Sequence, residues 1–210
     1  MLMNNMLAVA LATLSVALGT DALPSKSAAV ASAASSSLVC SPLWTGSRLS
    51  IRELLTNAKT ETVGSTSNHN SRDRLTVNTS NYPDWEFHTC KGPGIPSSKD
   101  GVVFGRLFDK GTGLCASLDN LPTGTDREVI WEKVCSADSK QAVKQLFSYS
   151  PSAKEILFAG DLPTFSDDKK GVYVIDIHTS YYIPKYPTRE VAVRHVDTYS
   201  GKHYILKRVP

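Results

Sequence analysis

The sequence lacks the features that mark several large classes of protein. Its 23 basic and 20 acidic residues leave a net charge of +3, which is too small to indicate a nucleic-acid partner. After the N-terminal segment, no stretch approaches the roughly 18 apolar residues that a membrane-spanning helix needs, and helical periodicity is scarce. The composition, with 41% hydrophobic and 8% aromatic residues, excludes a wholly disordered chain, a collagen-like repeat and a long coiled coil.

The known catalytic motifs are missing as well. The chain contains no Gly-x-Ser-x-Gly, no His-Glu-x-x-His and no phosphate-binding loop, and its cysteines form no Cys-x-x-Cys metal motif. We therefore expect a non-catalytic protein without cofactor or metal. One pair leaves a small secreted hydrolase as an alternative. Glu86 and His88 occupy alternate positions of a predicted strand and would point to the same side, where they could perform acid–base chemistry.

The N-terminal segment has the pattern of a secretory signal peptide. Met6 to Gly19 is an unbroken run of apolar and small residues, too short to cross a bilayer comfortably. The residues before it lack the usual Lys or Arg, and cleavage sites follow Gly19 and Ala22. A transmembrane anchor is the alternative, although no basic stop-transfer flank follows. We expect a signal peptide at residues 1–22, an Ala/Ser-rich linker at 23–37, and a secreted, extracellular domain at 38–210 without membrane contact.

Short β-branched and aromatic segments, separated by clusters of Gly, Pro, Asn and Ser, predict an all-β domain. The segments recur with a period of about 57 residues, which divides the domain into three units. A hairpin turn is expected at Thr45-Gly46-Ser47. Three units of four strands, closed so that no edge is bare, predict a β-trefoil, although a β-sandwich would give the same pattern. The expected strands of the first two units are 43–44, 48–52, 75–77 and 85–88, and 104–108, 114–118, 128–131 and 145–149. The opening hairpin of the third unit is less clear, and its expected strands are 172–177, 190–193 and 203–206.

The second unit resembles a known repeat. Gly113-Leu114-Cys115, Val129-Ile130-Trp131, Cys135 and Gln145-Leu146-Phe147 follow one another in the order of a ricin-B-type β-trefoil repeat, which closes on a Gln-x-Trp or Gln-x-Phe strand. The outer units share only the strand rhythm, since neither carries Gln-x-Trp. The resemblance implies a small secreted protein of fungal type that binds a carbohydrate or glycoprotein.

Four cysteines allow three pairings. The resemblance implies the bridge Cys115–Cys135. A trefoil unit brings its two ends together, which favours Cys40–Cys90. Asn78 begins the sequon Asn78-Thr79-Ser80 and is the candidate site of an N-linked glycan. A turn-forming Asn without a glycan is equally compatible with the sequence.

The sugar-contacting residues of the resembled family are not found at their usual positions. Its carboxylate lies two residues after the first Cys, where this chain has Ser117. Its aromatic residue lies two before the second Cys, where this chain has Lys133, and its amide precedes the Gln, where this chain has Lys144. Galactose binding in the family's geometry is therefore not implied.

A shifted carbohydrate site remains, because a sugar site needs a carboxylate, an aromatic face and an amide close together. The second unit offers these groups close together in the sequence. Each also has a structural alternative: Trp131 could be buried against another unit, Asp119-Asn120 could close a turn, and Gln145 could hydrogen bond to the backbone. The candidate residues are Asp119, Asn120, Trp131 and Gln145.

The third unit offers a different kind of binding element. Tyr181, Tyr182 and Tyr186 are interrupted by prolines, which predicts a surface loop suited to binding; packing of the rings over the core is the alternative. The unit is also locally basic, which a solvated charged face would explain. Its basic residues are Lys169, Lys170, Lys185, Arg189 and Arg194. A monomeric, protein-binding trefoil, either a protease inhibitor or a host-directed effector, is therefore the alternative to a carbohydrate-binding one.

Overall fold

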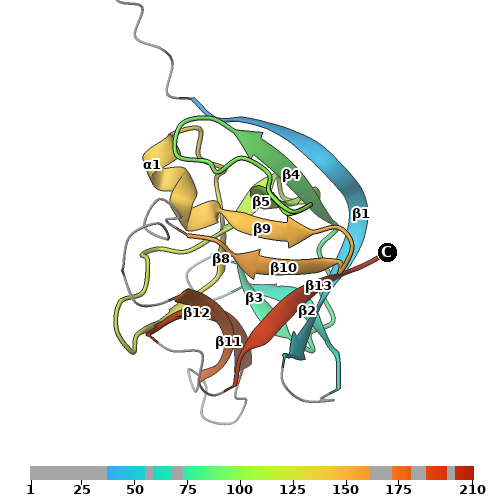
Figure 1. Cartoon of the computed structure of the whole chain (residues 1–210). Helices are drawn as coiled ribbons and strands as arrows, with labels where there is room; N and C mark the ends of the chain where they lie inside the picture. The colour runs from blue at the N-terminus through green and yellow to red at the C-terminus, as the bar shows by residue number, and fades with distance from the viewer. Residues whose placement is uncertain (1–36, 55–58, 68–72, 161–171, 181–187, 198–201) are drawn as a thin grey trace, which may run out of the picture. The chain divides into compact units, whose positions relative to one another are not determined.

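A computed structural model describes residues 37–54, 59–67, 73–160, 172–180, 188–197 and 202–210. These residues belong to one compact unit, Ser35–Pro210 (Figure 1). The predicted signal peptide and nearly all of the linker lie outside the described residues. So do Tyr181, Tyr182 and Tyr186 of the predicted binding loop, and Lys169, Lys170 and Lys185 of the basic unit.

The predicted all-β class is confirmed. The described residues form antiparallel strands with one short helix, α1 (Ser139–Ala142), and one 3₁₀ turn, η1 (Val143–Gln145). The strands are β1 (Val39–Glu53), β2 (Glu61–Ser67), β3 (Asp73–Val77), β4 (Trp85–Lys91), β5 (Val103–Asp109), β6 (Leu114–Ser117), β7 (Arg127–Val129), β8 (Trp131–Lys133), β9 (Phe147–Ser150), β10 (Glu155–Phe158), β11 (Val172–Ser180), β12 (Thr188–Val196) and β13 (Tyr204–Val209).

Six of the strands pair in a closed ring. The order is β1–β4–β5–β9–β10–β13, and β13 pairs again with β1 (Figure 1). Each ring strand therefore has a hydrogen-bonded neighbour on both sides. A closed ring removes the bare edges through which sheets aggregate.

Of the seven other strands in the described residues, six form three hairpins whose inner strands meet, and β7 pairs with β12. The hairpins are β2–β3, β6–β8 and β11–β12. The Leu75 N–H donates to the Ile130 carbonyl at 3.0 Å, and the Ile130 N–H donates to the Val191 carbonyl at 2.9 Å. Because Ile130 bonds to two different strands, it interrupts the predicted strand 128–131, which becomes β7 and β8. The three residues are fully buried, so each unit contributes one residue to this chain of backbone hydrogen bonds.

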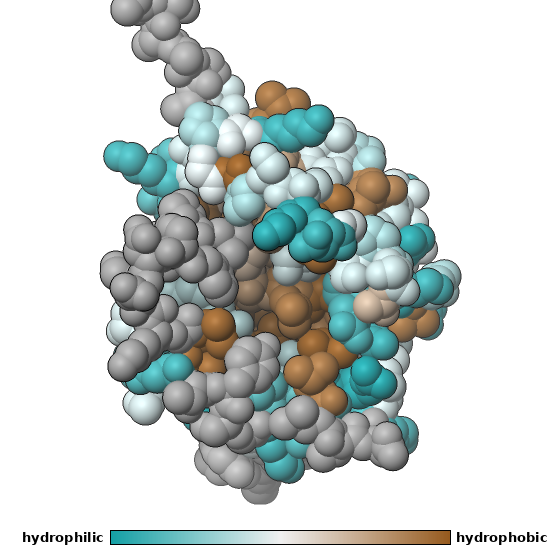
Figure 2. All heavy atoms as spheres, viewed as in Figure 1, coloured by the Kyte–Doolittle hydropathy of each residue, from teal (hydrophilic) through white to brown (hydrophobic). Residues whose placement is uncertain are grey.

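Alternating apolar residues of the ring and hairpins form one core. Trp85 and Phe87 on β4 and Phe147 on β9 are completely buried, and burial of each such side chain stabilises the fold by about 1.5–3 kcal/mol. In Figure 2, apolar side chains also reach the surface in a recess near the centre of the face shown, with hydrophilic side chains around it. The core cluster includes Trp44, Leu49, Ile51, Val63, Leu75, Val77, Leu107, Leu118, Ile130, Tyr149, Ile156, Phe158, Ile175, Val191, Val193 and Leu206.

Some element predictions were wrong. Residues 43–52 are not a hairpin but one strand, β1, because Gly46, with φ of +67°, forms a bulge instead of a reversal. Two strands were not predicted: β2, which contains a single bulky apolar residue, Val63, and β10, which has only four residues. Gln145 lies in η1, and the predicted strand 145–149 begins at Phe147.

Both predicted disulfides are confirmed. Cys40 and Cys90 face each other across the β1–β4 ladder, with Cα atoms 4.0 Å apart. Cys115 on β6 bonds to Cys135, just beyond β8, with Cα atoms 5.1 Å apart. Each bridge thus ties together two segments of a single unit.

Candidate functional site

Asp119, which follows β6, lies close to the two lysines that occupy contact positions of the resembled family, Lys133 on β8 and Lys144 in η1. The Lys133 ammonium forms an ion pair with the Asp119 carboxylate. The Lys144 ammonium donates to the Asp119 backbone carbonyl at 2.7 Å. The side chains of Asp119 and Lys133 are 35% and 28% exposed, so the pair is accessible to solvent and to a ligand.

Trp131 and Asn120 lie beside this cluster. Trp131 precedes Lys133 by two residues on β8, so both side chains are on the same face of the strand. Trp131 is half-buried, between full burial and full exposure. The Asn120 N–H hydrogen bonds to the Glu128 carboxylate, and burial raises the pKa of Glu128, while this hydrogen bond and the Lys144 charge oppose the increase. The hairpin surface therefore carries an aromatic ring, two carboxylates and two ammonium groups.

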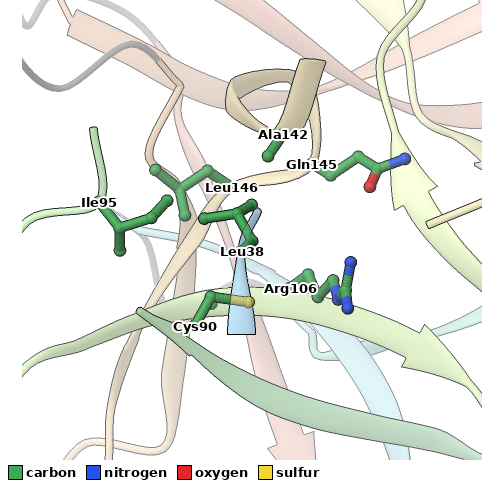
Figure 3. Close-up of a pocket in the computed structure, with 8 residues that line it drawn as sticks. Leu38, Cys90, Ile95, Arg106, Ala142, Gln145 and Leu146 are labelled. Atoms are coloured by element: carbon green, nitrogen blue, oxygen red, sulfur yellow. The ribbon is translucent and has the colours of Figure 1, made fainter. Parts of the chain in front are cut away.

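Gln145 does not join this cluster. Its Oε1 accepts from the Ser136 N–H and its Nε2 donates to the Val134 carbonyl, both at 2.9 Å. Gln145 and Arg106 line a small cavity together with apolar residues such as Leu38, and the Gln145 amide points away from it (Figure 3). That cavity measures about 10 Å³, space for no more than one water molecule. Gln145 therefore has the structural role considered for it above, in which its amide hydrogen bonds to the backbone.

Ser117 also has a structural contact. It is 3% exposed, and its hydroxyl donates to the Leu118 carbonyl at 3.1 Å. A sugar hydroxyl could not reach it without movement of β6. In the sequence, Lys133 and Lys144 are departures from the family pattern, and their approach to Asp119 was not predicted. Their alignment with two of the family's contact positions was the signal that could have found them.

Glu86 and His88, which were expected on the same side of a strand, contact each other on β4. The His88 Nε2 lies 2.8 Å from a Glu86 carboxylate oxygen, and the imidazole stacks on Phe108 with ring centroids 4.7 Å apart. Both side chains are largely buried, at 11% and 16% exposure. The pair and the Phe108 stack together fix the imidazole on the ring strand β4.

Of the five basic residues noted in the third unit, the structure describes Arg189 and Arg194, and both form ion pairs. Arg189 bonds to Glu61 at 2.6 Å. Arg194 and Arg127 face each other across the β7–β12 ladder, and the Asp176 carboxylate lies 3.3 Å and 2.6 Å from their Nε atoms. Facing like charges destabilise a sheet, and Asp176 neutralises part of this repulsion. This part of the unit is an ion-pair network.

Asn78 lies directly after β3, as expected for a strand-end sequon. It is exposed, has φ of +59°, and its Nδ2 donates to Glu61 at 2.8 Å. Asn tolerates this left-handed conformation better than most residues. The side chain to which a glycan would be attached is thus at the surface.

Comparisons with protein-family models, curated proteins and solved structures found no match. Within the described ranges, no helix is long and apolar enough to cross a membrane. The same ranges contain no cluster of His, Cys, Asp and Glu that could hold a metal ion.

Proposed function

We propose that this protein is a secreted, non-catalytic β-trefoil that binds carbohydrate or glycoprotein. The trefoil is supported by the closed ring of six strands and by the three hairpins, one per unit. The contact of Leu75, Ile130 and Val191 adds support, because it joins equivalent strands of the three units. The two disulfides are compatible with an oxidising, extracellular environment.

The convergence of Asp119, Lys133 and Lys144 beside Trp131 is the observation that carries carbohydrate binding. A carboxylate accepts hydrogen bonds from vicinal sugar hydroxyls, an ammonium donates to sugar oxygens, and an indole provides an apolar face for a pyranose. An exposed ion pair contributes only about 0–1 kcal/mol. A sugar can therefore take over part of the hydrogen bonding of Asp119 and Lys133 at little cost.

The test is glycan-array binding of the secreted, oxidised protein. Trp131→Ala is expected to weaken binding at least about tenfold through loss of the stacking face, whereas Trp131→Phe should retain most of it. Leu157→Ala changes an exposed residue on β10 and serves as the matched control. Silence across the array would contradict the proposal and leave the protein-binding trefoil as the better hypothesis.

A glycan on Asn78 is part of the same proposal. N-glycosidase treatment of protein secreted from a eukaryotic host should lower its mass by one N-glycan. Ser80→Ala removes the sequon and should abolish the shift, while leaving the Asn78 backbone and its bond to Glu61 intact. An unchanged mass after treatment of the wild type would show that Asn78 is only a turn residue.

A further inference from the structure

A further recess lies between the first unit and the end of β13, and none of its lining residues belongs to the hairpin β6–β8. Its volume is about 430 Å³, within the range of small-molecule sites. Three segments distant in the sequence form it: part of β1, the loop before β4, and the end of β13. The lining residues are Gly46, Ser47, Arg48, Tyr82, Pro83, Asp84, Val209 and Pro210. We call this recess the β1–β4 groove.

The bulge in β1 creates the floor of the groove. The β1–β4 register shifts on both sides of Trp44, and this residue packs into the core against Phe87, with ring centroids 6.1 Å apart. The Arg208 guanidinium lies 4.9 Å from the Trp44 ring centre and donates through Nε to the Ser47 hydroxyl at 2.8 Å. Ser47 is 2% exposed. The floor is therefore rigid before any ligand arrives.

The loop that carries Tyr82 is anchored at both ends. The Ser65 N–H donates to the Asn81 carbonyl and the Lys110 N–H donates to the Asp84 carbonyl, both at 3.0 Å. The loop also lies directly on Gly64 of β2, where a Cβ atom would overlap with the Asn81 carbonyl. An anchored loop loses little entropy on binding.

The polar groups of the groove are oriented toward solvent. Tyr82 keeps 38% of its surface exposed, and the Arg48 guanidinium lies 5.3 Å from its ring centre. Asp84 is also exposed. No ion pair engages Arg48 or Asp84 within the described part of the chain. An exposed cation and an exposed anion therefore line the same groove as the Tyr82 ring.

We propose that the β1–β4 groove binds a neutral pyranoside. The exposed part of the Tyr82 ring would contact the apolar C–H face of the sugar. Asp84 would accept hydrogen bonds from vicinal hydroxyls, and Arg48 would donate to a sugar oxygen. Because their charges cancel, a neutral sugar is favoured over an acidic one. The site shares no residue with the Asp119–Lys133 cluster, so it goes beyond the proposed function, and together the two sites make the protein bivalent.

The experiment is an NMR titration of the isotope-labelled protein with neutral methyl pyranosides of glucose, galactose, mannose and N-acetylglucosamine. At least one should cause saturable shifts at the backbone amides of Ser47, Arg48 and Asp84. Tyr82→Ala and Asp84→Asn should each weaken this binding at least about tenfold. Tyr82→Phe should retain it, and the thermal unfolding of each variant should match the wild type.

Trp131→Ala separates this proposal from the proposed function. It should leave the groove titration unchanged while it reduces binding at the β6–β8 hairpin. If none of the four sugars shifts the groove amides in a saturable way, or if Tyr82→Ala binds as well as the wild type, the groove is not a saccharide site. The hairpin site would still be supported in that case, provided that Trp131→Ala abolishes binding to the glycan array. Groove binding without any effect of Trp131→Ala on the array would instead overturn the hairpin site alone.

Discussion

Replacement of Arg74 by methionine is expected to lower the free energy of unfolding by about 3–5 kcal/mol. Arg74 on β3 forms an ion pair with Glu190 on β12, and their side chains are only 8% and 3% exposed. Burial raises the pKa of Glu190, while the charges of Arg74 and His178 oppose this increase. Without Arg74, the buried Glu190 must remain charged without its main counter-ion or bind a proton, and both cost free energy. Denaturant unfolding monitored by circular dichroism measures the loss.

Two comparisons make this prediction specific. The double variant Arg74→Met/Glu190→Leu removes both charges and should recover most of the lost stability, because no unpaired buried charge remains. Arg189→Met breaks the exposed pair with Glu61, whose side chains are 40% and 21% exposed, and should cost at most about 1 kcal/mol. Equal losses in Arg74→Met and Arg189→Met would mean that burial of the first pair has no energetic consequence.

The strand pattern predicted most of the ring because ring strands bury one face. Trp85, Phe87 and Phe147 alternate with more polar residues, which is the periodicity that a half-buried strand requires. The pattern could not predict that Ile130 bonds to two partner strands, since this depends on the meeting of all three hairpins. It also could not separate a bulge from a turn at Gly46, because both use a glycine with positive φ.

The candidate sites were less accessible to sequence reasoning. Asp119 and Trp131 were found because they flank the two cysteines of one unit, so local spacing places them on one hairpin. The groove was missed because Arg48, Tyr82 and Val209 come from three distant segments. Only the pairing of β1 with both β4 and β13 brings them together. No spacing within a single unit contains that information.

Glu132→Gln is expected to stabilise the protein above pH 7 by up to about 3 kcal/mol. Burial raises the pKa of Glu132 from 4.5 to about 7, and the neighbouring carboxylates of Asp109 and Asp73 add to the increase. The Thr112 hydroxyl lies 2.9 Å from Asp109 and 3.3 Å from Glu132. A hydroxyl has one proton, so it cannot donate to both carboxylates at once.

The sign of the pH dependence follows from proton binding. Between pH 4.5 and about 7 the folded state holds a proton on Glu132 that the unfolded state has released. The contribution of Glu132 to stability therefore falls as pH rises through this window and stays low above it. Glutamine cannot ionise, so the difference in unfolding free energy between variant and wild type should grow from pH 4.5 to 7 and then level off.

Unfolding titrations of the wild type and Glu132→Gln at several pH values measure this difference. Glu155→Gln, which changes a carboxylate that is 28% exposed beside Lys207, should show no comparable growth. A difference that is constant with pH would mean that Glu132 keeps an ordinary pKa in the folded protein. Glu132 lies between Trp131 and Lys133 on β8. Its ionisation therefore places a buried charge in the strand that carries the proposed sugar site. Array binding at the hairpin should therefore be stronger at pH 5.5 than at pH 8, while the β1–β4 groove, which does not contain this strand, should bind equally at both.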